Sequence, residues 1–252
     1  MLQKQRQEKI MECLAGGDYL SVEEAVKLFK SSPATIRRDF MELAESDQVL
    51  KVRGGIRSRK ASAMLPFSDR ESEYYAEKEE IAKSAVSMIR PGDVVFIDGG
   101  TTTFHMASYL PDINIRIITN SIRLASALEE KKSAAGWEIY ITGGFLYAKS
   151  GILLGPNAQS SLAQYHASLA FLSVSGIDEN GIYNNSELVV DMERVMINNS
   201  DRTVIIADHS KIGKQGLVKV CGLDRIKTLI TDSSKESKES LSKIRIEKIM
   251  VQ

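Results

Sequence analysis

Two groups of residues in this sequence have the types and the spacing needed to bind negatively charged molecules. The first lies near the N-terminus, where Ser32, Thr35, Arg37 and Arg38 follow one another closely. A serine directly before Pro33 is typical of a helix start, so these side chains would lie on the first turns of a helix. Arginines at that place in a helix-turn-helix meet phosphates or guanine acceptors in the major groove of DNA. The pattern indicates DNA binding, with the ordinary charged face of a helical packing module as the alternative.

The second group consists of five short segments, each of which follows an apolar run rich in β-branched residues. They cover residues 98–103, 119–121, 142–144, 175–178 and 208–211. In an open parallel sheet such segments gather at the carboxyl ends of the strands, where ligands bind. Glycines admit a ligand to the backbone, the N–H groups of a helix starting after Thr103 attract anions, and Lys211 adds a positive charge. We therefore expect a phosphate pocket.

Three helices would position the first group. Helical spacing predicts a helix over residues 2–15, with Arg6 on its apolar stripe. A Ser-x-x-Glu capping box at residues 21–24 predicts a second helix over 22–29. The third helix covers residues 33–45, and the short connection between the second and third helices predicts a helix-turn-helix.

A basic hairpin is predicted after the third helix. Short alternating runs flank Gly54-Gly55, a pattern typical of a tight turn between two strands. The basic residues around this turn, with no acidic one among them, are Lys51, Arg53, Arg57, Arg59 and Lys60. We expect Arg53 and Arg57 to bind DNA, since basic side chains of a wing contact the backbone or the minor groove. Residues 1–60 are therefore interpreted as a winged helix-turn-helix domain.

The rest of the chain reads as a larger α/β domain. Residues 57–75 are polar and lack helical periodicity, so we interpret them as a linker. Residues 76–252 alternate apolar runs with helical stretches. The predicted strands are 94–97, 116–118, 138–141, 170–174, 203–207 and 227–230. Apolar strands separated by helices indicate a mainly parallel sheet covered by helices on both faces, which makes the fold class α/β with an N-terminal winged helix-turn-helix.

Composition limits the classes of protein that fit. The 252 residues include 33 basic and 33 acidic ones, so a basic module is balanced by an acidic remainder. No apolar run is long enough to span a bilayer and the first residues are too polar for a signal peptide, so we expect a cytoplasmic protein with no membrane partner. The cysteines and histidines are too scattered for a metal site, and we expect neither a metal nor a cofactor. The role of His209, inside the fifth segment, stays open.

Both groups of residues resemble one protein family. Thr35-Ile36-Arg37-Arg38-Asp39-Phe40, followed by Gly54-Gly55, resembles the DNA-binding signature of DeoR-type bacterial transcriptional regulators. The five segments resemble the sensor domain of that family, whose first loop is commonly Asp-Ser-Gly-Thr-Thr, with Gly99 here in place of the serine. The resemblance implies a C-terminal domain similar to sugar-phosphate isomerases. It also implies effector-binding roles for Gly100, Thr101, Thr102, Thr103, Asn120, Gly143, Gly144, Asp178 and Lys211.

These observations favour a sequence-specific transcriptional regulator, expected to be a repressor controlled by a phosphorylated sugar or related metabolite. Helix-turn-helix proteins usually read two half-sites of double-stranded DNA as symmetric dimers, so we expect a homo-oligomer, either a dimer or a tetramer. The alternative is a sugar-phosphate isomerase-like enzyme with an added N-terminal module, whose general base would be Asp98, Asp178 or Asp208. No paired carboxylates or nucleophile arrangement supports that alternative, so we expect no enzyme and assign no catalytic residue.

Overall fold

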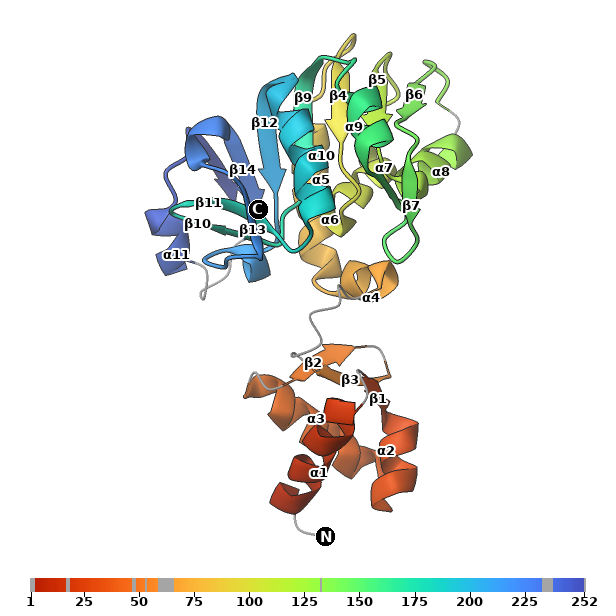
Figure 1. Cartoon of the computed structure of the whole chain (residues 1–252), viewed down its shortest axis with the longest axis vertical. Helices are drawn as coiled ribbons and strands as arrows, with labels where there is room; N and C mark the ends of the chain where they lie inside the picture. Colours follow the sequence, from red (N-terminus) through yellow and green to blue (C-terminus); the bar gives the residue numbers. More distant parts are fainter. Residues whose placement is uncertain are drawn as a thin grey trace. The chain divides into compact units, whose positions relative to one another are not determined.

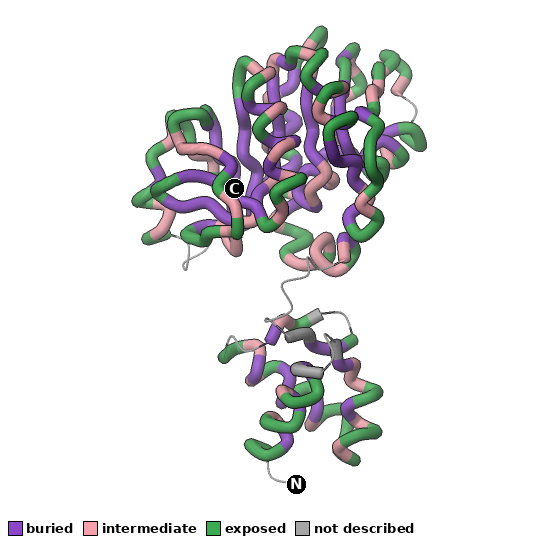
Figure 2. The backbone as a smooth tube through the Cα atoms, viewed as in Figure 1, coloured by how far each residue is buried: buried purple, intermediate pink, exposed green. Residues whose placement is uncertain are grey.

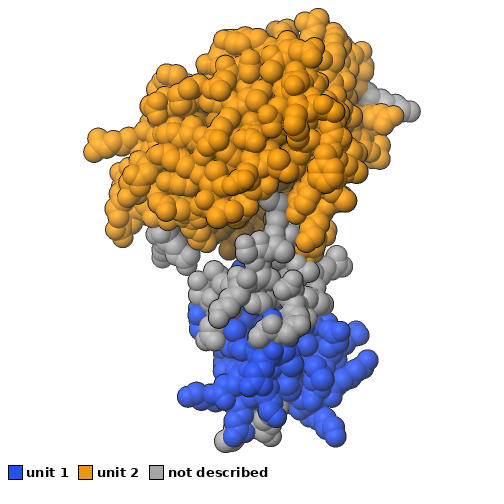
Figure 3. Space-filling view, viewed as in Figure 1, with its two compact units in different colours: residues 1–65 blue, residues 66–252 orange. Residues whose placement is uncertain are grey.

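The chain forms two compact units, residues 1–65 and residues 66–252 (Figure 3). The computed structural model describes residues 3–16, 19–46, 49–52, 54–58, 66–131, 133–232 and 238–251. In these ranges no helix combines the length and the apolar character needed to cross a membrane.

The N-terminal unit is a winged helix-turn-helix, as predicted. Its elements are α1 (Gln3–Gly16), β1 (Tyr19–Ser21), α2 (Val22–Phe29), α3 (Pro33–Glu45), β2 (Val49–Val52) and β3 (Gly55–Ser58). The sequence did not predict β1, which pairs with β3 to complete a three-stranded antiparallel sheet in the order β1-β3-β2. The core of this unit gathers one side of each helix, including the buried Ile10, Ala25, Ile36 and Phe40.

Local capping explains why these helices begin where they do. The Glu24 N–H donates to Ser21 Oγ at 3.1 Å, and the Ser21 N–H donates back to Glu24 Oε2 at 3.0 Å. At the start of α3, Ser32 Oγ accepts the Thr35 N–H at 3.2 Å. Each contact satisfies a backbone donor that the first helical turn leaves free. Ser21 and Glu24 thus fix the start of α2, and Ser32 fixes the start of α3 next to the short connection between the two helices.

A seven-stranded parallel sheet forms the centre of the C-terminal unit (Figure 1). Its order is β15-β14-β12-β9-β4-β5-β6, and every neighbouring pair is parallel. The strands are β4 (Val94–Ile97), β5 (Arg116–Thr119), β6 (Glu138–Ile141), β9 (Ala167–Leu172), β12 (Ser200–Ile206), β14 (Thr228–Thr231) and β15 (Lys248–Val251). The six predicted strands are confirmed, and β15 is an additional edge strand.

Helices cover both faces of this sheet, as predicted. Phe96 of β4 packs with α9 (Pro156–Leu162) and α10 (Glu187–Asn198) in one hydrophobic cluster. Its neighbours Val95 and Ile97 point to the opposite face, which the second cluster covers. The helices on that face are α5 (Tyr75–Val86), α7 (Met106–Tyr109) and α8 (Ile122–Lys131). Buried residues run along the central strands (Figure 2).

Smaller elements surround the sheet, and most of them were not predicted from the sequence; the helix after β4 was predicted, with a later start. They are α4 (Phe67–Ser72), α6 (Thr101–Phe104), the β7–β8 hairpin (Phe145–Tyr147, Ile152–Leu154), the antiparallel strands β10 (Gly176–Asp178), β11 (Gly181–Asn184) and β13 (Val218–Cys221), the short helices η1 (His209–Lys211) and η2 (Leu223–Arg225), and α11 (Lys238–Lys243).

The structure differs from the expected linker at residues 66–75, which belong to the C-terminal unit. Phe67 of α4 is buried, and its ring packs edge-on against Phe104 with the centroids 5.3 Å apart. The Arg123 guanidinium lies 4.8 Å from the same ring, and the Phe67 N–H donates to the Lys149 carbonyl at 3.3 Å. One aromatic residue thus anchors a segment that is otherwise polar.

Candidate functional sites

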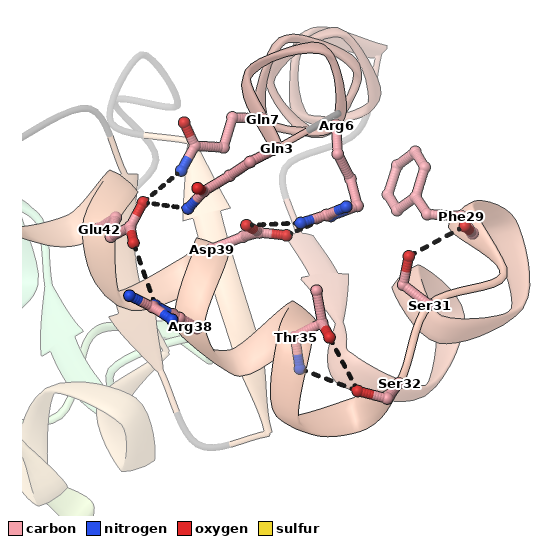
Figure 4. A network of polar contacts seen from close by, with 10 residues as sticks. All are labelled: Gln3, Arg6, Gln7, Phe29, Ser31, Ser32, Thr35, Arg38, Asp39 and Glu42. Carbon is pink, nitrogen blue, oxygen red and sulfur yellow. Dashed lines mark hydrogen bonds and ion pairs between the residues drawn. The ribbon is translucent and has the colours of Figure 1, made fainter. Parts of the chain in front are cut away.

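The start of α3 carries four of the predicted DNA-binding residues, Ser32, Thr35, Arg37 and Arg38, and Figure 4 shows all of these but Arg37. Arg37, Arg38 and Ser32 are exposed, and Thr35 is half-buried. Ser32 Oγ lies 2.8 Å from Thr35 Oγ1, so the two hydroxyl groups are held next to each other. The core residues of α3 lie on the opposite side of the helix, so the two arginines are available to a partner in solution.

The predicted basic wing is only partly described. Arg53, Arg59 and Lys60 lie outside the described residues. The backbone of Arg57 belongs to β3 and pairs with Leu50, while its side chain is outside the described part. Lys51 of β2 is exposed.

A buried ion pair holds α3 against α1, and the sequence analysis missed it. Arg6 Nε donates to Asp39 Oδ2 at 2.5 Å and Arg6 Nη2 donates to Asp39 Oδ1 at 3.0 Å (Figure 4). The side chains are 9% and 1% exposed. The position of Arg6 on the apolar stripe of the first helix was the available signal, because a charged residue there needs a buried partner.

In the C-terminal unit, Asp98 joins the loops after β4 and β9. These strands are neighbours in the sheet, and the chain leaves β4 toward β5 on one side and returns to β9 on the other. Asp98 Oδ1 accepts the Gly100 N–H at 3.1 Å and the Thr103 hydroxyl at 2.5 Å, while Oδ2 accepts the Ser173 N–H at 2.9 Å. Burial raises the pKa of Asp98, and these hydrogen bonds oppose the rise. A crevice at such a topological switch point is where open α/β sheets bind ligands.

The glycines of this loop allow close packing. A Cβ on Gly100 would lie 1.5 Å from Ser173 Oγ, and one on Gly99 would lie 2.1 Å from Ile152 Cγ2. Ile152 therefore occupies the space that a serine at position 99 would need. The helix that follows begins at Thr101 and not after Thr103, which corrects the expected helix start. All three threonines are buried.

The loops after β5 and β6 meet the β7–β8 hairpin. Asn120 is buried, its Nδ2 donates to the Leu153 carbonyl at 3.3 Å, and its Oδ1 has no partner among the described residues. Gly144 has a φ of +107°, and a Cβ on it would lie 2.7 Å from the Leu154 carbonyl oxygen. Gly143 has a φ of +68° with open space around it. Gly144 therefore serves close packing, whereas the backbone of Gly143 is open to a ligand.

Asp178 lies at a different kind of position, in the small antiparallel sheet. Its Oδ1 accepts the N–H groups of Asn180 and Gly181 at 2.8 and 3.1 Å, and its Oδ2 accepts Gln215 Nε2 at 2.6 Å. Burial would raise the pKa of Asp178, but these hydrogen bonds outweigh it and lower the pKa. The carboxylate thus closes the β10–β11 turn, and these hydrogen bonds do not connect it to the loop of Asp98.

Charged side chains gather at the carboxyl end of β12, and three of them come from residues 70–78, which include the end of the expected linker. Asp208 and Lys211 follow β12, and the segment contributes Arg70, Glu73 and Lys78. Lys78 is 2% exposed, and its Nζ donates to the Arg70 carbonyl. Its spacing from Ile81 and Ala85 places it on the apolar stripe of α5, a signal that could have identified it.

In this cluster, burial and the neighbouring charges act in opposite directions on the pKa values of Lys78 and Glu73. Burial lowers the pKa of Lys78 to about 8, with the Asp208 and Glu73 carboxylates opposing the shift and Lys211 adding to it. Burial also raises the pKa of Glu73, while Lys211 and Lys78 lower it. Cations from η1 and from the α4–α5 segment therefore act on the same region. An added anion would favour the charged form of Lys78.

Several buried polar atoms at the carboxyl ends of the strands have no hydrogen-bond partner among the described residues. They are Asn120 Oδ1 after β5, Asp208 Oδ2 and Ser210 Oγ after β12, and Thr231 Oγ1 of β14. Buried polar groups are normally satisfied by protein, water or ligand. These atoms would suit the hydroxyl groups of a small polar molecule.

His209 is held in place by the end of β14. Its Nδ1 lies 2.6 Å from Asp232 Oδ2, and the Asp232 Oδ1 accepts the His209 N–H at 2.6 Å. The Tyr74 ring packs edge-on against it at 4.6 Å. Within the described ranges, no group of His, Cys, Asp and Glu side chains could hold a metal ion.

Comparisons with known proteins agree on both units. A family model described as "DeoR-like helix-turn-helix domain" matches residues 6–62, and one described as "DeoR C terminal sensor domain" matches residues 73–233. The chain is 35% identical to the uncharacterized HTH-type transcriptional regulator YulB of Bacillus subtilis, over 92% of this chain and 90% of that protein. It is 34% identical to the glycerol-3-phosphate regulon repressor of Escherichia coli, over 92% of both chains.

Further similarities extend to another repressor and to distant structures. The HTH-type transcriptional repressor GlcR of Bacillus subtilis is 34% identical, over 92% of this chain and 89% of that protein. Among solved structures, ribose 5-phosphate isomerase A from Methanocaldococcus jannaschii overlaps 53% of this chain and 52% of its own, with 16% identity and a TM-score of 0.38. This structural overlap does not bear on the activity of the chain.

Proposed function

The chain belongs to the DeoR family of transcriptional regulators, and on this premise we propose that it represses transcription by binding a DNA operator. It would release the operator when a phosphorylated sugar binds at the carboxyl edge of its parallel sheet. The observation that carries the proposal is that the two units present different kinds of groups. One presents two exposed arginines on a capped helix, and the other gathers cations and unpartnered polar atoms around a sheet edge.

On the DNA side, α3 would enter the major groove. Arg37 and Arg38 would meet base edges or phosphates, Ser32 and Thr35 would face the backbone, and the wing with Arg53 and Arg57 would add contacts that carry little sequence information. Because an operator read in this way has two half-sites, we propose that the protein acts as a symmetric homo-oligomer.

On the sensor side, the ligand would be a sugar phosphate. Lys211 and Lys78 would supply positive charge after β12, and the first residues of α6 would add backbone N–H groups after β4, two strands away in the sheet. Asn120 Oδ1 and Asp208 Oδ2 would accept hydroxyl groups of the sugar. A phosphate carries close to two negative charges at neutral pH, so it would compete with the Glu73 carboxylate for the same cations.

The isomerase alternative finds less support in this geometry. An isomerase needs a carboxylate free to take a proton from the sugar. Both oxygens of Asp98 accept hydrogen bonds from the loops after β4 and β9, and both oxygens of Asp178 accept hydrogen bonds within its turn and from Gln215. These two carboxylates shape loops, which suits a pocket that binds without turnover, whereas the third candidate base, Asp208, keeps one oxygen, Oδ2, without a partner among the described residues.

The proposal can be tested with the full-length protein in two steps. Duplexes are selected from a randomised library, and the affinity for the selected duplex is then measured at fixed salt with glycerol 3-phosphate and hexose phosphates as probes. We expect at least one probe to lower the DNA affinity and to raise the melting temperature of the protein, because a ligand stabilises the state that binds it. Failure to select any duplex, or isomerisation of a probe at about 1 per second or faster, would contradict the proposal.

The pKa of Lys78 predicts how sugar-phosphate binding depends on pH. The ammonium form attracts the phosphate and the neutral amine does not, so affinity should fall by up to about tenfold per unit as pH rises above 8. The phosphate itself stays a dianion over this range, since its second pKa is about 6. Titration calorimetry from pH 7 to pH 10 would measure the trend. Lys78→Arg is the control, because an arginine stays charged and should remove this pH dependence.

A further inference from the structure

A carboxylate on α3 holds the side chain of one of the two exposed arginines. Glu42 Oε1 lies 3.4 Å from Arg38 Nε, one helical turn away. The other oxygen of Glu42 accepts hydrogen bonds from two glutamines of α1, Gln3 Nε2 at 2.5 Å and Gln7 Nε2 at 2.9 Å. Figure 4 shows the resulting chain of contacts from α1 through Glu42 to Arg38.

This arrangement adds little to the stability of the fold. The Arg38 and Glu42 side chains are 81% and 39% exposed, and exposed ion pairs contribute little to stability. The order along the helix, arginine before glutamate, is also the less favourable one with respect to the helix dipole. Helix stability therefore does not account for the contact between Arg38 and Glu42.

The geometry leaves one edge of the guanidinium free. Glu42 contacts Arg38 at Nε, so the two terminal Nη groups can donate to another acceptor. Two parallel N–H groups are what an arginine uses to recognise O6 and N7 of a guanine. Because the two amides of α1 fix the carboxylate, they also fix the direction in which this edge points.

We propose that Glu42 is a positioning residue for DNA specificity, which holds Arg38 for a base edge and keeps it from the nearest phosphate. The proposal rests on the proposed function, since it assumes that α3 reads DNA. An arginine without this restraint can reach phosphates of any sequence, and such contacts raise affinity without discrimination. The negative charge of Glu42 additionally disfavours a close phosphate.

The test compares two substitutions that remove the same charge from the same helix. Glu42→Gln keeps the size of the side chain, and Glu45→Gln is the matched control because Glu45 is exposed on α3 and no ion pair with Arg38 is found in the described residues. Full-length proteins are titrated with the duplex selected by the wild type, with its single base-pair variants and with a scrambled duplex. Glu42→Gln should lower the ratio of selected to scrambled affinity by about tenfold, which corresponds to the loss of one base contact.

A double-mutant cycle separates positioning from charge. In an Arg38→Ala background, Glu42→Gln should no longer change the affinity ratio, because its effect passes through Arg38. Replacing Gln3 and Gln7 together by alanine should reproduce part of the Glu42→Gln effect. The salt dependence for the scrambled duplex should steepen by about one unit in Glu42→Gln, as expected for one new phosphate contact.

Three results would decide against the proposal. Equal ratios for Glu42→Gln and Glu45→Gln, or an undiminished effect in the Arg38→Ala background, overturn it while the proposed function stands. A wild-type protein that selects no duplex overturns the proposed function and this inference together. Thermal unfolding of each variant shows whether α3 is intact, so a folding defect cannot pass for a loss of specificity.

Discussion

Replacing Asp39 with alanine is expected to lower the free energy of unfolding of the N-terminal unit by about 3–5 kcal/mol, because Arg6 loses the buried carboxylate that receives two of its N–H groups. A unit of this size has a total stability of only a few kcal/mol, so most molecules would lose α3 and with it DNA binding. Urea unfolding of the full-length protein would measure the change. Far-ultraviolet circular dichroism would report on both units, while the fluorescence of the single tryptophan, Trp137, would report on the C-terminal unit.

The control for this experiment removes both charges. Replacing Arg6 with methionine and Asp39 with leucine in one protein should recover most of the lost stability, since an apolar pair of similar volume avoids the cost of desolvating charges. A midpoint for the tryptophan fluorescence that stays at the wild-type value would show that the C-terminal unit is unaffected. A cost below about 1 kcal/mol for Asp39→Ala would mean that the pair behaves as a surface ion pair.

Lys211→Ala should weaken sugar-phosphate binding by about 10-fold to 150-fold, the range expected for a lost hydrogen bond to a charged group of about 1.5–3 kcal/mol. DNA binding without the sugar phosphate should be unchanged, because Lys211 belongs to the C-terminal unit and the residues proposed to contact DNA belong to the first unit. Titration calorimetry with the probe that releases the wild type from DNA would measure the first effect, and a DNA titration the second.

Lys219→Ala is the matched variant, since Lys219 is an exposed lysine of β13 in the same unit. It should bind both the probe and the DNA as the wild type does. An equal loss of probe affinity in the two variants would show that only the overall charge of the unit matters. Undiminished probe binding in Lys211→Ala would place the phosphate elsewhere.

Much of the fold could be predicted because its signals are local. The starts of α2 and α3 follow from Ser21 with Glu24 and from Ser32 with Pro33, contacts within three or four residues. The parallel strands follow from apolar runs that are buried on both faces. The antiparallel strands β7, β10 and β13 escaped prediction because they are only three or four residues long, and β10 and β13 also contain a glycine or a charged residue. Their pairing partners are set by tertiary contacts.

The candidate sites divide in the same way. The loops at the carboxyl edge could be predicted because every parallel strand places the loop that follows it at one edge of the sheet. Arg70 and Glu73 could not, since their segment reads as a linker until Phe67 is seen to anchor it. Lys78 lies beyond that segment, and its place on the apolar stripe of α5 was a usable signal. In the sequence Asp39 stands out only as part of the DNA-binding signature, and its burial depends on Arg6, 33 positions earlier.

The strand order of the large sheet also affects how the protein reaches its native state. Asp98 and Ser173 join the loops of neighbouring strands from 75 positions apart, so long stretches of chain must be closed before the centre of the sheet can pair. Folding slows as the mean sequence separation of contacts grows. The strand pairings of the N-terminal unit join positions at most 38 apart. A newly made chain should therefore form α3 before its sheet is complete. During that interval the unit proposed to bind DNA would be formed, while the sheet edge proposed to bind a sugar phosphate would not.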